Sequence, residues 1–244
     1  MTSPTDPQGE LNLSISSLME AYPPHPLTKG VRGNMVATID GAIAINGRST
    51  ALSSETDKAI FRFLRATCSA IVVGAKTAQV EKYGPVTIGA EFAELRKTLG
   101  LAPKPRLVVV GNARHDLQWI HGLSDLSNPT ILVISDAPPS LFVDKGLTDT
   151  SAISTHSEPT TIIADLCQHS PSPVLCEGGP GLLTTLANAS LLAELCLTQT
   201  LLVAGSSSPS LFGDLSRPLQ LSEAHLFRDP THRFSRYRVD GGEH

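Results

Sequence analysis

The chain has 244 residues, of which 41% are hydrophobic and 17% are charged, and its formal net charge is −4. This size and composition suit one large α/β domain or two small ones. The slightly acidic balance argues against a nucleic-acid-binding protein, which requires a clustered basic face. No apolar run approaches the ~20 residues needed to cross a bilayer.

The four cysteines are widely spaced and form no C-x-x-C motif, and the eight histidines show no metal-ligand spacing. Residues 1–10 are polar and acidic, without the basic start and apolar stretch of a secretory signal. We therefore expect reduced thiols, a cytoplasmic location and no metal site.

Residues 1–28 are rich in Ser and Pro and are predicted to form an N-terminal extension. One short amphipathic stretch, Leu11–Tyr22, ends at Pro23-Pro24, and we expect it to pack on the surface or on a partner subunit. The character of the sequence changes at Val31, and residues 29–244 contain no internal repeat. These residues are expected to form a single domain.

That domain begins with a predicted strand at Val31–Ile39. Asp40-Gly41 is a hairpin-type turn signal, and Ala42–Ile45 follows it as the expected returning strand.

A helix is predicted after the polar loop that follows. Ser53 or Ser54 would cap it, and Asp57 stands three residues after Ser54, as in a capping box. The apolar face of this helix would carry Ile60, Phe61, Leu64 and Ala66.

The rest of the domain alternates between short apolar runs and helical stretches. A helix is expected at Glu158–His169, with apolar side chains facing inward. The predicted strands are Ala70–Gly74, Arg106–Val110, Thr130–Ile134, Val174–Cys176, Glu194–Ala204, Ala224–Phe227 and Arg233–Val239. The last two would form an antiparallel pair. This order predicts a three-layer α/β fold whose central mixed sheet is mostly parallel, with antiparallel strands at the C-terminus.

The segment Glu177-Gly178-Gly179-Pro180 lies between the strand that ends at Cys176 and an apolar helical stretch. A glycine turn into a helix that starts at proline leaves backbone N–H groups free at the positive end of the helix dipole, which suits a phosphate. The alternative is a tight strand-to-helix connection without a ligand, because Gly-Gly-Pro alone is a weak motif.

Several strands end in small or polar residues, namely Gly74, Gly111, Ser135 and Glu177. In open α/β sheets, ligands bind beyond the carboxyl ends of the strands. A dinucleotide would fit there, but neither G-x-G-x-x-G nor a P-loop is present. The pattern therefore favours a dinucleotide-binding sheet other than the standard Rossmann domain.

Four motifs in order and spacing resemble the riboflavin-biosynthesis pyrimidine reductases, which share the dihydrofolate reductase fold. The motifs are Asn34–Gly41, Leu64-Arg65-Ala66, Val73–Thr77 and Val174–Pro180, and the resemblance covers about residues 30–240. The zinc deaminase half of the bifunctional enzymes, with its H-x-E and P-C-x-x-C motifs, is missing. The chain therefore resembles a stand-alone reductase.

The resemblance implies a homodimer that binds NADPH across the strand ends. The implied reaction is reduction of 5-amino-6-(5-phosphoribosylamino)uracil, a phosphorylated pyrimidine, to its ribitylamino product. Hydride would pass from the nicotinamide to C1′ of the sugar once the ring has opened.

Site residues follow from the resemblance, position by position. Asp40 and Glu177 would be catalytic. The expected substrate-binding residues are Asn34, Ser53, Arg65 and Glu81. The expected cofactor-binding residues are Ala37, Thr38, Gly74, Ala75, Thr77, Ser135, Gly178, Gly179, Pro180, Gly181 and Leu182.

Several of these positions allow a second interpretation. Asp40 precedes Gly41 and could simply form the turn, and Arg65 could form a salt bridge at the C-terminus of its helix. Ser135, Arg114 and Lys76 are unranked candidates for the 2′-phosphate of NADPH.

The chain also departs from the bifunctional enzymes at several positions, which are Asn34, Lys76, Gln79, Glu81 and Tyr83–Pro85. These changes affect the expected substrate pocket more than the cofactor pocket. Two alternatives therefore stay open: a related reductase for another pteridine or pyrimidine such as dihydrofolate, and a non-catalytic NADP(H)-binding protein.

Overall fold

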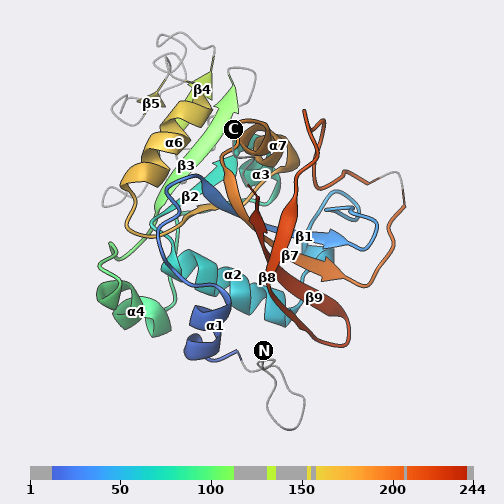
Figure 1. The fold of residues 1–244 in the computed structure, drawn as a ribbon, viewed down its shortest axis with the longest axis horizontal. Helices are drawn as coiled ribbons and strands as arrows, with labels where there is room; N and C mark the ends of the chain where they lie inside the picture. The colour runs from blue at the N-terminus through green and yellow to red at the C-terminus, as the bar shows by residue number, and fades with distance from the viewer. Residues whose placement is uncertain (1–12, 113–130, 136–152, 155–157, 206–207, 241–244) are drawn as a thin grey trace.

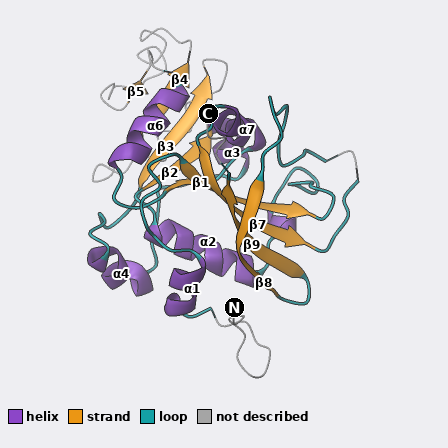
Figure 2. Cartoon of the chain, in the orientation of Figure 1, coloured by secondary structure: helices purple, strands orange, loops and turns teal. Residues whose placement is uncertain are grey.

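The computed structural model describes residues 13–112, 131–135, 153–154, 158–205 and 208–240. The described residues form one nine-stranded sheet with helices on both faces (Figures 1 and 2). The strand order is β5-β4-β3-β2-β6-β1-β7-β9-β8. Neighbouring strands are parallel from β5 to β7 and antiparallel from β7 to β8. The predicted mixed α/β sheet is therefore confirmed.

All the strands except β5, which was not predicted, lie close to their predicted positions. Their bounds are β1 Val31–Thr38, β2 Ala70–Gly74, β3 Arg106–Asn112, β4 Ile131–Ser135, β5 Ile153–Ser154, β6 Val174–Cys176, β7 Leu192–Thr200, β8 Leu221–Arg228 and β9 His232–Val239. The α-helices are α1 Ile15–Ala21, α2 Glu55–Thr67, α3 Ala75–Val80, α4 Ala93–Thr98, α6 Pro159–His169 and α7 Pro180–Asn188. Two short 3₁₀ turns lie at Thr50–Leu52 and Ala90–Phe92.

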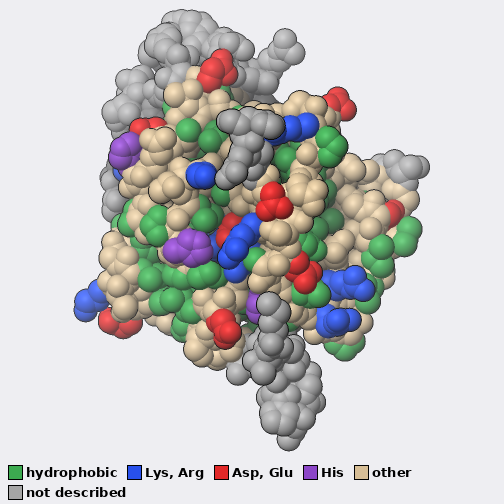
Figure 3. Space-filling model, viewed as in Figure 1, with side chains coloured by type: hydrophobic (Ala, Val, Ile, Leu, Met, Phe, Trp, Pro, Cys, Tyr) green, Lys and Arg blue, Asp and Glu red, His purple; other side chains and the backbone are tan. Residues whose placement is uncertain are grey.

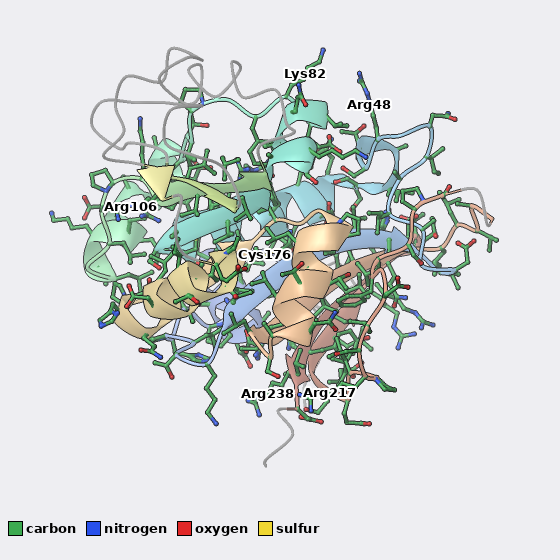
Figure 4. All side chains as sticks on the ribbon, turned by 90° about the horizontal axis from the view of Figure 1, so that it is seen from above. Arg48, Lys82, Arg106, Cys176, Arg217 and Arg238 are labelled. Carbon is green, nitrogen blue, oxygen red and sulfur yellow. The ribbon has the colours of Figure 1, made fainter. Side chains whose placement is uncertain are left out.

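The sheet separates two apolar layers. Alternate residues of a strand point to opposite faces, so Ile71 and Val73 of β2 pack with α1 and α2, whereas Ala70 and Val72 pack with α6 and α7. Cys176 lies at the centre of the molecule in Figure 4. All four cysteines are buried free thiols, and burial raises the pKa of the Cys176 thiol to about 12.

The expected hairpin after β1 is wrong. Asp40-Gly41 does form a turn, because the Gly41 N–H donates to the Thr38 carbonyl at 3.0 Å. Ala42–Ile45, however, forms only isolated bridges, one of them from Ala42 to Ser210. The chain after the turn pairs with a distant segment instead: the Ile43 N–H donates to the Pro209 carbonyl at 3.0 Å, and the Leu211 N–H donates to the Gly41 carbonyl at 3.0 Å. Strand β7 occupies one edge of β1 along its whole length, and β6 pairs only with Arg32 and Gly33 on the other edge.

The amphipathic stretch before β1 packs into the core. Leu18, Ala21 and Tyr22 are buried with the α2 side of the sheet. The chain here is also held by two buried arginines: Arg32 donates to the Pro23 carbonyl at 2.9 Å, and Arg236 donates to the Ala21 carbonyl at 2.7 Å. Residues 13–28 are thus integrated with the sheet.

Candidate active site

A pocket of about 680 Å³ opens beyond the carboxyl ends of β1, β2 and β6. All four residues expected to bind substrate line it: Asn34, Ser53, Arg65 and Glu81. Glu177 lines it as well, together with Thr77, Gly179 and Pro180 from the expected cofactor set. The fold therefore brings together residues that are up to 146 positions apart (34 to 180).

Glu177 is the centre of a hydrogen-bonded cluster in this pocket. Its side chain is only 2% exposed, and an ionised carboxylate at this depth requires donors. Arg65 supplies two, from Nε to Oε1 at 2.7 Å and from Nη2 to Oε2 at 2.6 Å. The Tyr83 hydroxyl supplies a third, to Oε2 at 2.5 Å.

The Arg65 guanidinium contacts two aromatic rings. Its carbon lies 4.3 Å from the ring centroid of Phe61 and 5.3 Å from that of Tyr83, within cation–π range. Burial opposes its charge, but the hydrogen bonds to Glu177 and the attraction of that carboxylate raise the pKa of Arg65 above its ordinary value. The carboxylate partner of Arg65 is therefore Glu177, an acid on the neighbouring strand end.

Helix α2 presents this arginine because of its capping and spacing. Ser54 is the N-cap and accepts a hydrogen bond from the Asp57 N–H at 3.1 Å, as the capping box predicts. Phe61 and Arg65 are four residues apart and share a helix face. Phe61, predicted in the core, faces the pocket instead, and Phe63 is the buried aromatic residue of this helix.

Two further carboxylates line the pocket and are anchored by serines. Asp57 accepts a hydrogen bond from the Ser53 hydroxyl. Glu81 accepts one from the Ser49 hydroxyl at 2.8 Å and another from the Ser49 N–H at 3.3 Å. Ser49 was not among the predicted site residues, because nothing in the sequence pairs the loop before α2 with the end of α3.

The turn after Glu177 is tightly packed against β2 and α3. The Gly74 N–H donates to the Gly178 carbonyl at 2.8 Å, and the Gly178–Gly179 peptide is cis. A Cβ at Gly179 would lie 2.3 Å from the Thr77 hydroxyl oxygen. The first backbone bond of α7 runs from Leu183 to Gly179, so the N–H groups of the preceding turn point out of the helix start.

We expect Gly179→Val to abolish measurable binding of a phosphate-bearing cofactor, because the new side chain would displace Thr77 and the turn. Fluorescence titration with NADPH measures the affinity, and circular dichroism checks that the fold persists. Gly213→Ala is the matched control and should keep the NADPH affinity, since a Cβ at Gly213 would make an ordinary contact of 3.6 Å with the Thr184 hydroxyl oxygen and Gly213 is outside the pocket lining. Unchanged NADPH affinity in Gly179→Val would show that the cofactor does not bind at this turn.

Asp40 lies outside the pocket. Its carboxylate is exposed and accepts hydrogen bonds from the Thr38 hydroxyl at 2.5 Å and from the N–H groups of Ala204 and Gly205, the shortest at 2.8 Å. These bonds lower the pKa of Asp40 from 3.8 to about 2, the Thr38 hydroxyl contributing most. The structure thus supports the interpretation of Asp40 as a turn-forming residue. Its position outside the pocket does not support the expected catalytic role.

A pH prediction follows from this lowered pKa. The stability that Asp40 contributes should be fully present above its unfolded value of 3.8 and should disappear as the pH falls towards about 2. Urea unfolding of the wild type and Asp40→Asn across this range checks the sign. A difference between the two proteins that grew as the pH fell would contradict it.

The other expected cofactor residues are not among those that line the pocket. Ala37 and Thr38 are buried in β1, and Gly74 and Ala75 join β2 to α3. Gly178, Gly181 and Leu182 belong to the turn and the first turn of α7, without lining the pocket. Of the candidates for the 2′-phosphate, Lys76 lines the pocket. The Ser135 backbone pairs with Asn112 at the same sheet edge, and Arg114 is outside the described residues.

Tyr83 was named only as a departure from the family pattern, yet it completes the Glu177 cluster. Its position depends on the way α3 ends. The Tyr83 N–H donates to the Ala78 carbonyl at 2.8 Å and the Lys82 N–H to the Gln79 carbonyl at 3.2 Å, with Lys82 at φ 53°. This is a Schellman motif. A glycine at position 82 would have predicted this motif from the sequence, whereas a lysine at that position does not.

Basic and acidic side chains are both scattered among uncharged ones on the face of the molecule shown in Figure 3. Among residues 13–112 and the other described segments, no cluster of His, Cys, Asp and Glu is suited to a metal ion. No helix within these segments is long and apolar enough to cross a membrane.

Comparison with solved structures shows the fold. A pyrimidine reductase-like protein from Corynebacterium diphtheriae superposes with a TM-score of 0.76 at 23% identity, covering 92% of this chain and 99% of that one. The riboflavin biosynthesis reductase Rib7 of Saccharomyces cerevisiae gives 0.58 at 14% identity, with 93% and 99% coverage. RibD from Acinetobacter baumannii gives 0.63 at 16% identity, and the match covers 87% of this chain but 58% of that longer protein.

A dihydrofolate reductase from Enterococcus faecalis, complexed with NADP(H), gives a TM-score of 0.50 at 10% identity. No curated protein matches the sequence. The family model described as the RibD C-terminal domain matches residues 29–232, which is most of the chain. Together with the sheet order and the pocket at its carboxyl edge, this match shows that the chain belongs to the RibD C-terminal domain family.

Proposed function

We propose that this protein is an NADPH-dependent reductase that converts 5-amino-6-(5-phosphoribosylamino)uracil to its ribitylamino product. The observation that carries the proposal is the juxtaposition of two features in one pocket. The buried Glu177–Arg65 pair borders the space for a substrate, and the Gly-Gly turn at the start of α7 follows Glu177 directly.

The residues of the turn fit a dinucleotide diphosphate. The start of α7 offers backbone N–H groups and the positive end of the helix dipole. Gly179 and Pro180 line the pocket, so a phosphate can approach the main chain there. Thr77 and Lys76 line the adjacent wall from α3, and Lys76 would lie on the phosphate side.

When bound, the nicotinamide would supply the hydride to C1′ of the ring-opened sugar, where C1′ is double-bonded to nitrogen. The nitrogen then takes a proton, which balances the reduction. Glu177 has about four lone-pair positions, of which Arg65 and Tyr83 use three. The fourth, on Oε1, is open to a sugar hydroxyl, so Glu177 would orient the sugar beside the cofactor.

The test is the loss of NADPH absorbance with the aminouracil ribosyl phosphate and, in parallel, with dihydrofolate. Turnover of the first substrate alone supports the proposal. NADPH binding without turnover of either would instead support a non-catalytic NADP(H)-binding protein.

Asp57 is compatible with dihydrofolate as a second candidate substrate. Its carboxylate lines the pocket from the first turn of α2 and is bonded to Ser53. A carboxylate pairs well with two adjacent N–H donors, which the amino-substituted edge of a pteridine offers. The N1–H of the aminouracil and the N–H on its C6 form a similar pair, so the two substrates must be compared directly. Turnover of dihydrofolate alone would establish this candidate.

We further propose that the protein works in the cytoplasm as a homodimer. The four free thiols support a reducing location. An exposed apolar patch at the ends of β1 and β7, formed by Ile39, Leu201, Leu202 and Val203, supports self-association. Light scattering of the purified protein would determine the oligomeric state.

A further inference from the structure

We propose that Tyr83 is a positioning residue that determines which oxygen of Glu177 meets the substrate. The inference rests on the proposed reductase function and deepens it. It is carried by the hydrogen bonds that converge on Glu177 and by the way the backbone holds Tyr83.

The two oxygens of Glu177 are unequally occupied. Oε2 accepts from Arg65 Nη2 at 2.6 Å and from the Tyr83 hydroxyl at 2.5 Å, whereas the one donor to Oε1 among the described residues is Arg65 Nε, at 2.7 Å. Each carboxylate oxygen has two lone pairs. Tyr83 therefore fills Oε2 and leaves one acceptor position on Oε1. Without the Tyr83 hydroxyl, Arg65 alone would leave one free acceptor position on each oxygen. A substrate hydroxyl could then donate to either of them.

The backbone fixes the direction from which Tyr83 approaches. Lys82 adopts a left-handed conformation with φ 53° and extends away from the molecule in Figure 4. The chain turns there, so the next residue points inward, and the Tyr83 N–H is tied to the Ala78 carbonyl. The ring of Tyr83 then lies 5.3 Å from the Arg65 guanidinium carbon, which also lies 4.3 Å from the ring of Phe61.

Tyr83 is suited to hold a proton rather than to release one. Burial raises the pKa of its hydroxyl well above 10.0, and the charge of Glu177 raises it further. The hydroxyl therefore remains a donor at neutral pH, and a group with such a pKa is a poor general acid. Tyr83 therefore suits a positioning role, and not the delivery of the proton to the product.

The experiment compares Tyr83→Phe with a matched Tyr→Phe change away from the pocket. Tyr83→Phe keeps the ring beside Arg65 and removes only the hydroxyl. We expect kcat to fall about 10- to 100-fold, with the NADPH dissociation constant changed less than about twofold, since the turn at Gly179 is untouched. Tyr237→Phe, in β9 outside the pocket lining, should leave kcat unchanged.

A double variant tests whether Tyr83 acts through Glu177. If it does, adding Tyr83→Phe to Glu177→Gln should cost less than about twofold in kcat, because the carboxylate that the hydroxyl orients is already gone. An effect of Tyr83 that is independent of Glu177 predicts instead that the two losses of kcat multiply. A purely structural role predicts that Tyr83→Phe alone lowers the melting temperature but not kcat. Either of those results would overturn the inference.

The proposed function is tested separately, by the activity and NADPH binding of the wild type. Kinetics are measured with whichever of the two substrates the wild type reduces. A wild type that binds no NADPH and reduces neither substrate would overturn the reductase function and this role with it. An active wild type together with a fully active Tyr83→Phe would overturn the role of Tyr83 alone.

Discussion

Replacing Glu177 by Gln is expected to lower kcat of the proposed reduction by about 100-fold with little change in the affinity for NADPH. The amide has nearly the same shape as the carboxylate, but its NH₂ group would face donors of Arg65 or Tyr83. The cluster must then rearrange, and the acceptor that would orient the substrate moves. Steady-state kinetics and NADPH fluorescence titration measure the two effects.

The same variant should also lose stability, because Arg65 would remain in the pocket without its counter-ion. We expect a loss of about 2–3 kcal/mol, below the range for a fully buried pair, because the Arg65 side chain is 20% exposed. Kinetics must therefore be compared at a temperature where circular dichroism shows both proteins folded. A kcat equal to that of the wild type would show that Glu177 has no part in the reaction.

The second large effect concerns stability alone and arises at Glu194. This buried glutamate lies between two buried arginines, with 2.7 Å contacts to both Arg32 and Arg236. Glu194→Gln would leave two buried cations sharing a neutral partner. Loss of one member of a buried ion pair costs about 3–5 kcal/mol, and we expect urea unfolding to show a decrease of this size.

The matched control is Glu94→Gln. Glu94 and Lys97 are both exposed and lie 3.9 Å apart, so this change should cost no more than about 1 kcal/mol. Because Arg32 and Arg236 also hold the carbonyls of Pro23 and Ala21, Glu194→Gln should loosen the segment before β1, measurable as faster hydrogen exchange there. Equal unfolding free energies for the two variants would refute the prediction.

Much of the fold could be predicted from the chain because its local signals agree. The apolar runs and caps placed the strands within a few residues, and the Ser54 cap and the start of α7 at Pro180 are where the sequence indicated. The prediction was wrong at Ala42–Ile45, where an Asp-Gly turn followed by an apolar run is the pattern typical of a hairpin. The segment after the turn bonds to residues 209–211 instead, and no local pattern predicts a contact with so distant a segment.

The candidate site, like the fold, could be predicted from the sequence only in part. The sequence by itself determined the Gly-Gly turn after a buried strand and its carboxylate Glu177, because these depend on residues that are close together in the chain. It also determined the family, because each of the four motifs is a short local segment and their order can be read along the chain. Only the tertiary structure decided the partners of the carboxylate. Arg65 and Tyr83 lie 112 and 94 positions away, and Asp40, which belongs to the Asn34–Gly41 motif, bonds to residues 204–205 instead. Hydrogen bonds and ion pairs form between whatever groups the folded backbone brings within reach, and that proximity is a property of the whole sheet rather than of any local segment.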